Sequence, residues 1–202
     1  MDPARVVLRE HLSAAHMRVD AAFSQYNLTE LDGFGGFLSA HAAAFRTVQG
    51  VVGTCDLIDY KSLLTLLEHD LSVLGRDVPE LSQCSASYDS INALGAAYVV
   101  AGSHFGKKVL SQRWSKSTDP RVLRASRFIM TDILREAWPA VMSQLSKQYG
   151  SVSFEASLRA ARATFAVFED IALAQNDSAR SQSSNPQAKH AFASGSPLPQ
   201  LA

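Results

Sequence analysis

The chain of 202 residues carries 19 basic and 19 acidic side chains, so its formal net charge at pH 7 is zero. This length fits one domain with a sizeable core, and a neutral chain has no overall field to attract nucleic acid or an anionic membrane. The longest apolar run, residues 93–101, is far shorter than the roughly 20 residues of a membrane-spanning helix. The charged N-terminus lacks the apolar run of a signal peptide, so we expect a cytoplasmic protein that binds neither nucleic acid nor membrane.

Hydrophobic residues recur at three- and four-residue spacing along most of the chain, which is typical of amphipathic helices. The pattern predicts helices over residues 3–26, 33–48, 60–75, 92–114, 121–149 and 152–175. We expect Gly50 to close the second helix and Pro139 to kink or restart the fifth. No stretch alternates with the period of a strand, so the sequence predicts an all-α, compact helical bundle over residues 1–175. The Ser-, Pro- and Gln-rich residues 176–202 predict a disordered tail.

Three glycines share one face of the fourth predicted helix. Gly95, Gly102 and Gly106 lie seven and four residues apart, so they stack on one side and leave the backbone uncovered. A glycine inside a helix costs about 1 kcal/mol relative to alanine, so three on one face indicate that another group approaches the main chain. That group is either a second helix, the commoner case, or a flat ligand.

His16 lies four residues after Leu12 and three before Val19, on or beside the apolar stripe of the first helix. A single histidine in such a place is more often a hydrogen-bonded core residue than a ligand. Its neutral imidazole would also suit the iron of a flat macrocycle that lies against the glycine face. The residue pattern alone leaves both interpretations open.

The sequence lacks the motifs of several common sites. It has no GxSxG elbow, no HExxH pair and no phosphate-binding loop, so a conventional hydrolase or nucleotide site is poorly supported. Cys55 and Cys84 show neither CxxC spacing nor a histidine at zinc-site spacing, and we interpret both as small, partly buried side chains.

Four segments are similar, in order, to the first three helices and the distal helix of bacterial heme oxygenases associated with bacteriophytochromes. They are LREHLSAAHMRVDAAF, YNLTELDGFGGFLSAHAAAF, YKSLLTLLEHDLSVLG and ALGAAYVVAGSHFGKKVL. The resemblance runs from about Leu8 to Phe168, and its most specific part is the Gly-Ser-x-x-Gly run from Gly102 to Gly106. It implies a heme-oxygenase-like bundle.

The resemblance also assigns roles to residues. It implies that His16 is the proximal ligand of the heme iron and that Gly102, Ser103 and Gly106 form the catalytic distal face. The implied heme contacts, including cations for the propionates, are Arg9, Tyr98, Lys107 and Arg159.

This chain departs from the family at three positions. Lys107 replaces a second glycine, Leu12 replaces a common threonine, and Ser13 replaces a frequent basic residue. The Lys107 side chain either points outward, reaches a propionate or narrows the pocket.

The activity implied by the resemblance is the opening of heme, which is both substrate and cofactor, to biliverdin, carbon monoxide and ferrous iron. It requires dioxygen and electrons from an external donor such as a reductase or ferredoxin, and a bacteriophytochrome is a candidate recipient of biliverdin. Two other hypotheses remain: a non-enzymatic heme-binding or sensing protein on the same scaffold, and a helical interaction module in which the glycines only pack helices.

Overall fold

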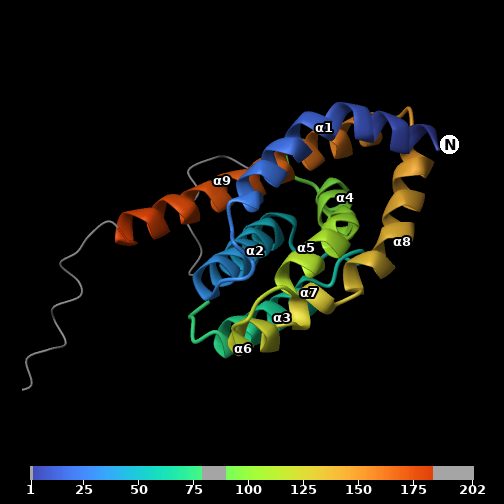
Figure 1. Cartoon of the computed structure of the whole chain (residues 1–202). Coiled ribbons are helices and arrows are strands. Elements are labelled where there is room, and N and C mark those ends of the chain that lie inside the picture. The colour runs from blue at the N-terminus through green and yellow to red at the C-terminus, as the bar shows by residue number, and fades with distance from the viewer. Residues whose placement is uncertain (1, 79–89, 184–202) are drawn as a thin grey trace, which may run out of the picture.

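The computed structural model describes residues 2–78 and 90–183, and within them every regular element is helical (Figure 1). The prediction of a compact all-α fold is thus confirmed for these residues. The elements, in chain order, are α1 (Pro3–Ser24), α2 (Leu31–Val52), α3 (Tyr60–Val73), α4 (Ala93–Gly102), the 3-10 turn η1 (Ser103–Gly106), α5 (Lys107–Trp114), α6 (Pro120–Arg124), α7 (Arg127–Met130), α8 (Ile133–Gln148) and α9 (Val152–Ser183).

Helix ends follow local capping chemistry in several places. Asp59 accepts a hydrogen bond from the Ser62 amide at the start of α3, and Asn92 accepts one from the Gly95 amide at the start of α4. The second helix differs from the prediction at both ends. It begins after Glu30, whose side chain makes no cap bond, and it continues beyond Gly50 to Val52. Gly53, at φ 68°, ends it because glycine adopts this left-handed conformation without strain.

The predicted helix over residues 121–149 is wrong as a single element, since the structure divides it into α6, α7 and α8. Asp70 of α3 explains the break before α7. Its fully buried carboxylate accepts hydrogen bonds from the backbone amides of Arg127 and Phe128, at 3.2 and 2.8 Å. These hydrogen bonds join residues 57 and 58 positions apart in the chain, so local sequence patterns do not predict them. Pro139 lies inside α8, which continues through it without a fresh start.

The last helix is longer than predicted. α9 continues from Val152 to Ser183, so the first residues of the predicted tail, 176–183, belong to it, and the rest lie outside the described residues. Cys84 also lies outside them. Along its length α9 packs against α1, α2 and α4, and α8 covers α4 from another side (Figure 1). α9 therefore supports the elements that bear the predicted site residues.

The core consists of aromatic and aliphatic side chains from most of these helices, among them Phe34, Phe45 and Phe154. In the described part of the chain, no helix combines the length and the apolar character that crossing a membrane requires.

Candidate functional site

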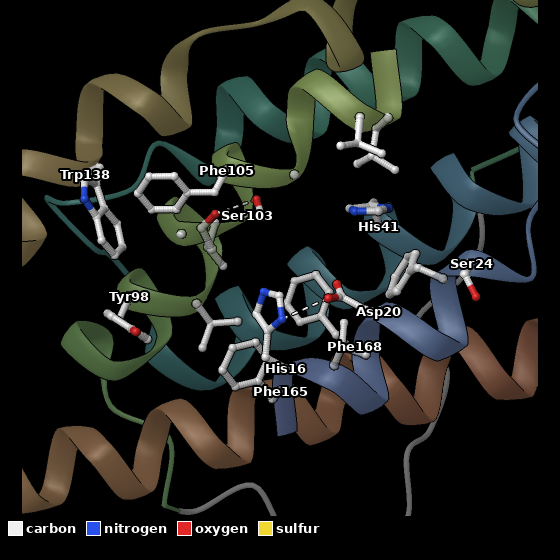
Figure 2. Close-up of a pocket in the computed structure, with 18 of the residues that line it drawn as sticks. His16, Asp20, Ser24, His41, Tyr98, Ser103, Phe105, Trp138, Phe165 and Phe168 are labelled. Carbon is white, nitrogen blue, oxygen red and sulfur yellow. Dashed lines mark hydrogen bonds and ion pairs between the residues drawn. The ribbon is translucent and has the colours of Figure 1, made fainter. Parts of the chain in front are cut away.

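A cavity of about 650 Å³ lies between α1 and the wall formed by α4, η1 and α5 (Figure 2). This volume is within the range of small-molecule sites, which is roughly 300–1,000 Å³. The lining is mainly apolar and includes Phe23, Phe37, Val100, Leu110, Phe165 and Phe168. Polar side chains enter it at separate places on α1, α2 and η1. This partly open cavity thus suits a large, mostly apolar ligand with a few polar contacts.

His16 projects into this cavity from α1. Its Nδ1 lies 3.0 Å from Oδ2 of Asp20, one helical turn further along α1. Because a carboxylate only accepts hydrogen bonds, Nδ1 carries the proton, and the lone pair of Nε2 is left for a ligand. The Phe165 ring of α9 stands edge-on to the imidazole, with 5.7 Å between ring centroids. The imidazole thus has a contact on two sides, although 58% of the His16 side chain is exposed.

The glycine face divides into two parts with different neighbours. A Cβ at Gly95 would lie 2.6 Å from Cβ of Ala160 and 2.8 Å from the backbone nitrogen of Ala161, both on α9. Gly95 thus permits close packing of α4 on α9. Gly102 and Gly106 instead line the cavity, where an added Cβ would meet Trp138 at 3.3 Å and Leu110 at 4.0 Å, respectively. Gly95 therefore faces a second helix, whereas Gly102 and Gly106 face the cavity.

Ser103 lies on the wall opposite His16 (Figure 2). Its hydroxyl donates a hydrogen bond to the Val100 carbonyl at 2.8 Å, so the oxygen keeps its lone pairs for a donor in the cavity. Tyr98 lies near Trp138, with ring centroids 5.5 Å apart, and the two rings close one end of the cavity. Burial raises the pKa of Tyr98, although the charge of Arg5 opposes this effect, so the phenol is protonated at pH 7.

The cavity is bordered by three arginines. Arg5 and Arg9 come from α1, four residues apart and so on one face, and Arg113 comes from α5. The Arg5 guanidinium lies 5.8 Å from the centroid of the Phe105 ring. Arg159, predicted as a further cation, is exposed on α9 and does not line the cavity. The cationic border is thus on α1 and α5.

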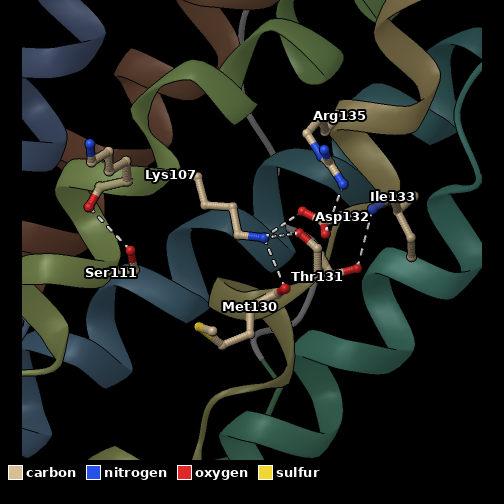
Figure 3. Close-up of polar contacts among 8 residues, drawn as sticks. Lys107, Ser111, Met130, Thr131, Asp132, Ile133 and Arg135 are labelled. Carbon is tan, nitrogen blue, oxygen red and sulfur yellow. Dashed lines mark hydrogen bonds and ion pairs between the residues drawn. The ribbon is translucent and has the colours of Figure 1, made fainter.

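Lys107 does not line the cavity either, and its side chain extends toward the junction of α7 and α8 (Figure 3). Nζ donates hydrogen bonds to the carbonyls of Met130 and Thr131 and to Oδ1 of Asp132, at 2.8, 2.7 and 2.8 Å. The Lys107 ammonium holds the pKa of the Asp132 carboxyl below its usual value. The Lys107 side chain thus points outward and leaves the cavity unobstructed.

His41 of α2 lines the same cavity, away from His16 and nearer to α5 (Figure 2). Its Nδ1 lies 2.9 Å from the Phe37 carbonyl oxygen, which only accepts, so Nδ1 carries the proton and Nε2 is an acceptor. The rings of Phe23 and Phe37 lie 4.6 and 4.3 Å from the imidazole centroid. Burial lowers the pKa of His41 to about 4, so the ring is neutral at pH 7.

The structure brings together most of the predicted site residues, namely Arg9, His16, Tyr98, Gly102, Ser103 and Gly106. Arg5, Asp20 and His41 are additions. Asp20 follows His16 by four residues and Arg5 precedes Arg9 by four, so helical spacing offered a signal for both. No signal in the sequence indicated Trp138, because this residue reaches the cavity through the packing of α8 on α4.

In residues 2–78 and 90–183, no three His, Cys, Asp or Glu side chains gather as a metal-binding group. Comparisons of the chain with protein-family models, with curated proteins and with solved structures each gave no match. The resemblance to heme oxygenases therefore rests on the sequence segments that carry it.

Proposed function

We propose that the protein is a heme oxygenase that opens heme to biliverdin, carbon monoxide and ferrous iron with dioxygen and external electrons. The observation that carries the proposal is the opposition of His16, with Nε2 free, to the bare backbone at Gly102 and Gly106 across one cavity. His16 would hold the iron of a flat macrocycle, and the backbone at Gly102 and Gly106 would leave room for a small ligand on the other side. Bound heme would supply the redox and oxygen chemistry.

The chain's own residues have separable tasks in this proposal. Asp20 contacts Nδ1 of His16 and so directs Nε2 toward the ligand, while Phe165 packs edge-on against the imidazole. Arg5 and Arg9 offer guanidinium groups for the two propionates. Ser103 holds a water by its oxygen lone pairs on the distal wall.

The outward position of Lys107 supports turnover over the alternative of a non-enzymatic heme-binding or sensing protein. A lysine in the cavity would obstruct the distal side and favour that alternative, whereas the Lys107 ammonium is bound to the α7–α8 junction. The family resemblance alone supports the electron donor and the recipient of biliverdin.

The test is a hemin titration of the purified protein followed by reduction. We expect a saturable Soret band that decays into biliverdin absorbance, with release of carbon monoxide, when ferredoxin or ascorbate is added with an iron chelator. His16→Ala should remove the axial-histidine spectrum, whereas His11→Ala, an exposed histidine on the same helix, should not. A Soret band that stays stable under several reductants refutes the enzyme and favours the sensor. No saturable band at all removes both heme proposals.

A further inference from the structure

One polar atom of the cavity has no task in the proposed reaction. In the part of the chain that the structure describes, His41 makes its hydrogen bond through Nδ1, to the Phe37 carbonyl. Nε2 is therefore an acceptor without a protein partner, and the residue lines the cavity. Because the ring is neutral, Nε2 offers an uncharged lone pair to a hydrogen-bond donor.

The surroundings of His41 restrict which groups can donate a hydrogen bond to Nε2. Five aromatic rings lie within about 6 Å of the imidazole, and these belong to Phe23, Phe37, Phe45, Phe128 and Phe168. Hydrocarbon neighbours offer no donor, so only a ligand or a water can satisfy Nε2. Nε2 faces the cavity, and a ligand that fills the space beside it without offering a donor would leave this acceptor unsatisfied, which is costly.

The two tetrapyrroles of the proposed reaction differ in this donor. In a closed iron porphyrin all four nitrogens bind the metal, and the edge away from the propionates carries only hydrocarbon groups. Ring opening produces a metal-free chain whose two terminal rings are lactams, each with an N–H and a carbonyl. The closed ring thus leaves Nε2 to a water, whereas the open chain can replace that water with its own N–H.

We propose that His41 recognises a linear tetrapyrrole by accepting a hydrogen bond at Nε2 from the N–H of a terminal lactam ring. The inference rests on the proposed function and extends it, because it makes the cavity a binding site for the product as well as for heme. Retention by His41 opposes product release.

The test compares two ligands in three proteins. Biliverdin and hemin are titrated into the wild type, His41→Leu and His41→Gln, and the ratio of the two affinities is reported, which cancels any loss of folded protein. We expect His41→Leu to weaken biliverdin about tenfold while hemin changes less than twofold, as removal of one hydrogen bond predicts. His41→Gln should restore part of the ratio, since its amide oxygen accepts. His11→Leu is the matched surface control.

Two results would overturn the inference while leaving the proposed function intact. One is equal weakening of both ligands by His41→Leu, which indicates packing alone. The other is a His41→Leu variant that binds both ligands as tightly as the wild type, which means that no ligand donor reaches Nε2. Failure of the wild type to bind hemin is a different outcome, because it removes the proposed function and the inference with it.

Discussion

Gly95 and Gly106 lie on the same predicted helical face, yet the structure gives alanine opposite effects at the two positions. At Gly95 a Cβ would collide with the Ser157 carbonyl oxygen and approach the backbone nitrogen of Ala161 to 2.8 Å. Both are main-chain atoms of α9, so neither can rotate away. At Gly106 the nearest atom is Cδ1 of Leu110 at 4.0 Å, an ordinary contact.

The expected magnitudes follow from two terms. Alanine improves helix propensity by about 1 kcal/mol at either position, whereas overpacking a close contact costs about 1–3 kcal/mol. At Gly95 the backbone clash places the cost at the upper end, so we expect Gly95→Ala to lose about 1–2 kcal/mol of unfolding free energy. Gly106→Ala carries no such cost and should gain up to about 1 kcal/mol.

Urea unfolding of the ligand-free protein, followed by circular dichroism, measures both variants against the wild type. In thermal unfolding the same free energies correspond to a Tm lower by about 2–8 °C for Gly95→Ala and higher by up to about 4 °C for Gly106→Ala. If Gly95→Ala is as stable as the wild type, the close approach of α4 to α9 is refuted. If Gly106→Ala is the less stable of the two, the assignment of the glycines to packing and to cavity is reversed.

Three further predictions concern other parts of the fold. Lys107→Met should speed amide hydrogen exchange over residues 103–110, because it removes three hydrogen bonds to the α7–α8 junction. Lys108→Met changes an exposed neighbour and should leave the exchange rates as in the wild type. Equal exchange in the two variants would contradict this prediction. His41 has a folded pKa of about 4 against about 6.5 unfolded, so the unfolded chain binds more protons between these values and stability falls as the pH is lowered from about 6.5 to 4. Urea unfolding at both pH values should show up to about 3 kcal/mol more loss in the wild type than in His41→Leu, and parallel losses would refute the pKa shift. Asp70→Ala should cost about 1–3 kcal/mol in the same assay, since it leaves two α7 amides without their acceptor, and a neutral result would show that those amides find another partner.

The sequence predicted the helical segments because their apolar periodicity is strong, and it predicted the opposition of His16 to the glycine face through spacing and family resemblance. It did not predict the division of residues 121–149, because the Asp70 carboxylate that fixes α7 comes from 57 residues earlier in the chain. Local propensity contains no information about such a contact.

His16 and His41 show which features of the site the sequence does not specify. His41 lies in an Ala-rich stretch of α2, and nothing in that stretch indicates a cavity. The structure shows that His41 is bonded to its own helix through one nitrogen and also lines the cavity through the other side of the ring. Whether a ring nitrogen meets a partner or an open space depends on the packing of α1, α5 and α9 around it, which spacing within α2 does not specify.

The shared support of α1 and α4 on α9 constrains how a ligand enters. Since both walls are attached to one long helix, separating them requires α9 to lose contacts on two sides at once. The segment from Ser103 to Trp114 is different, because it begins with a 3-10 turn bordered by two glycines and is fastened through Lys107. Displacing this wall of the cavity therefore requires loss of the Lys107 contacts together with the hydrogen bonds from Arg113 to the Tyr26 carbonyl and from Trp114 to the Val122 carbonyl, so the segment is bonded to its neighbours at both ends.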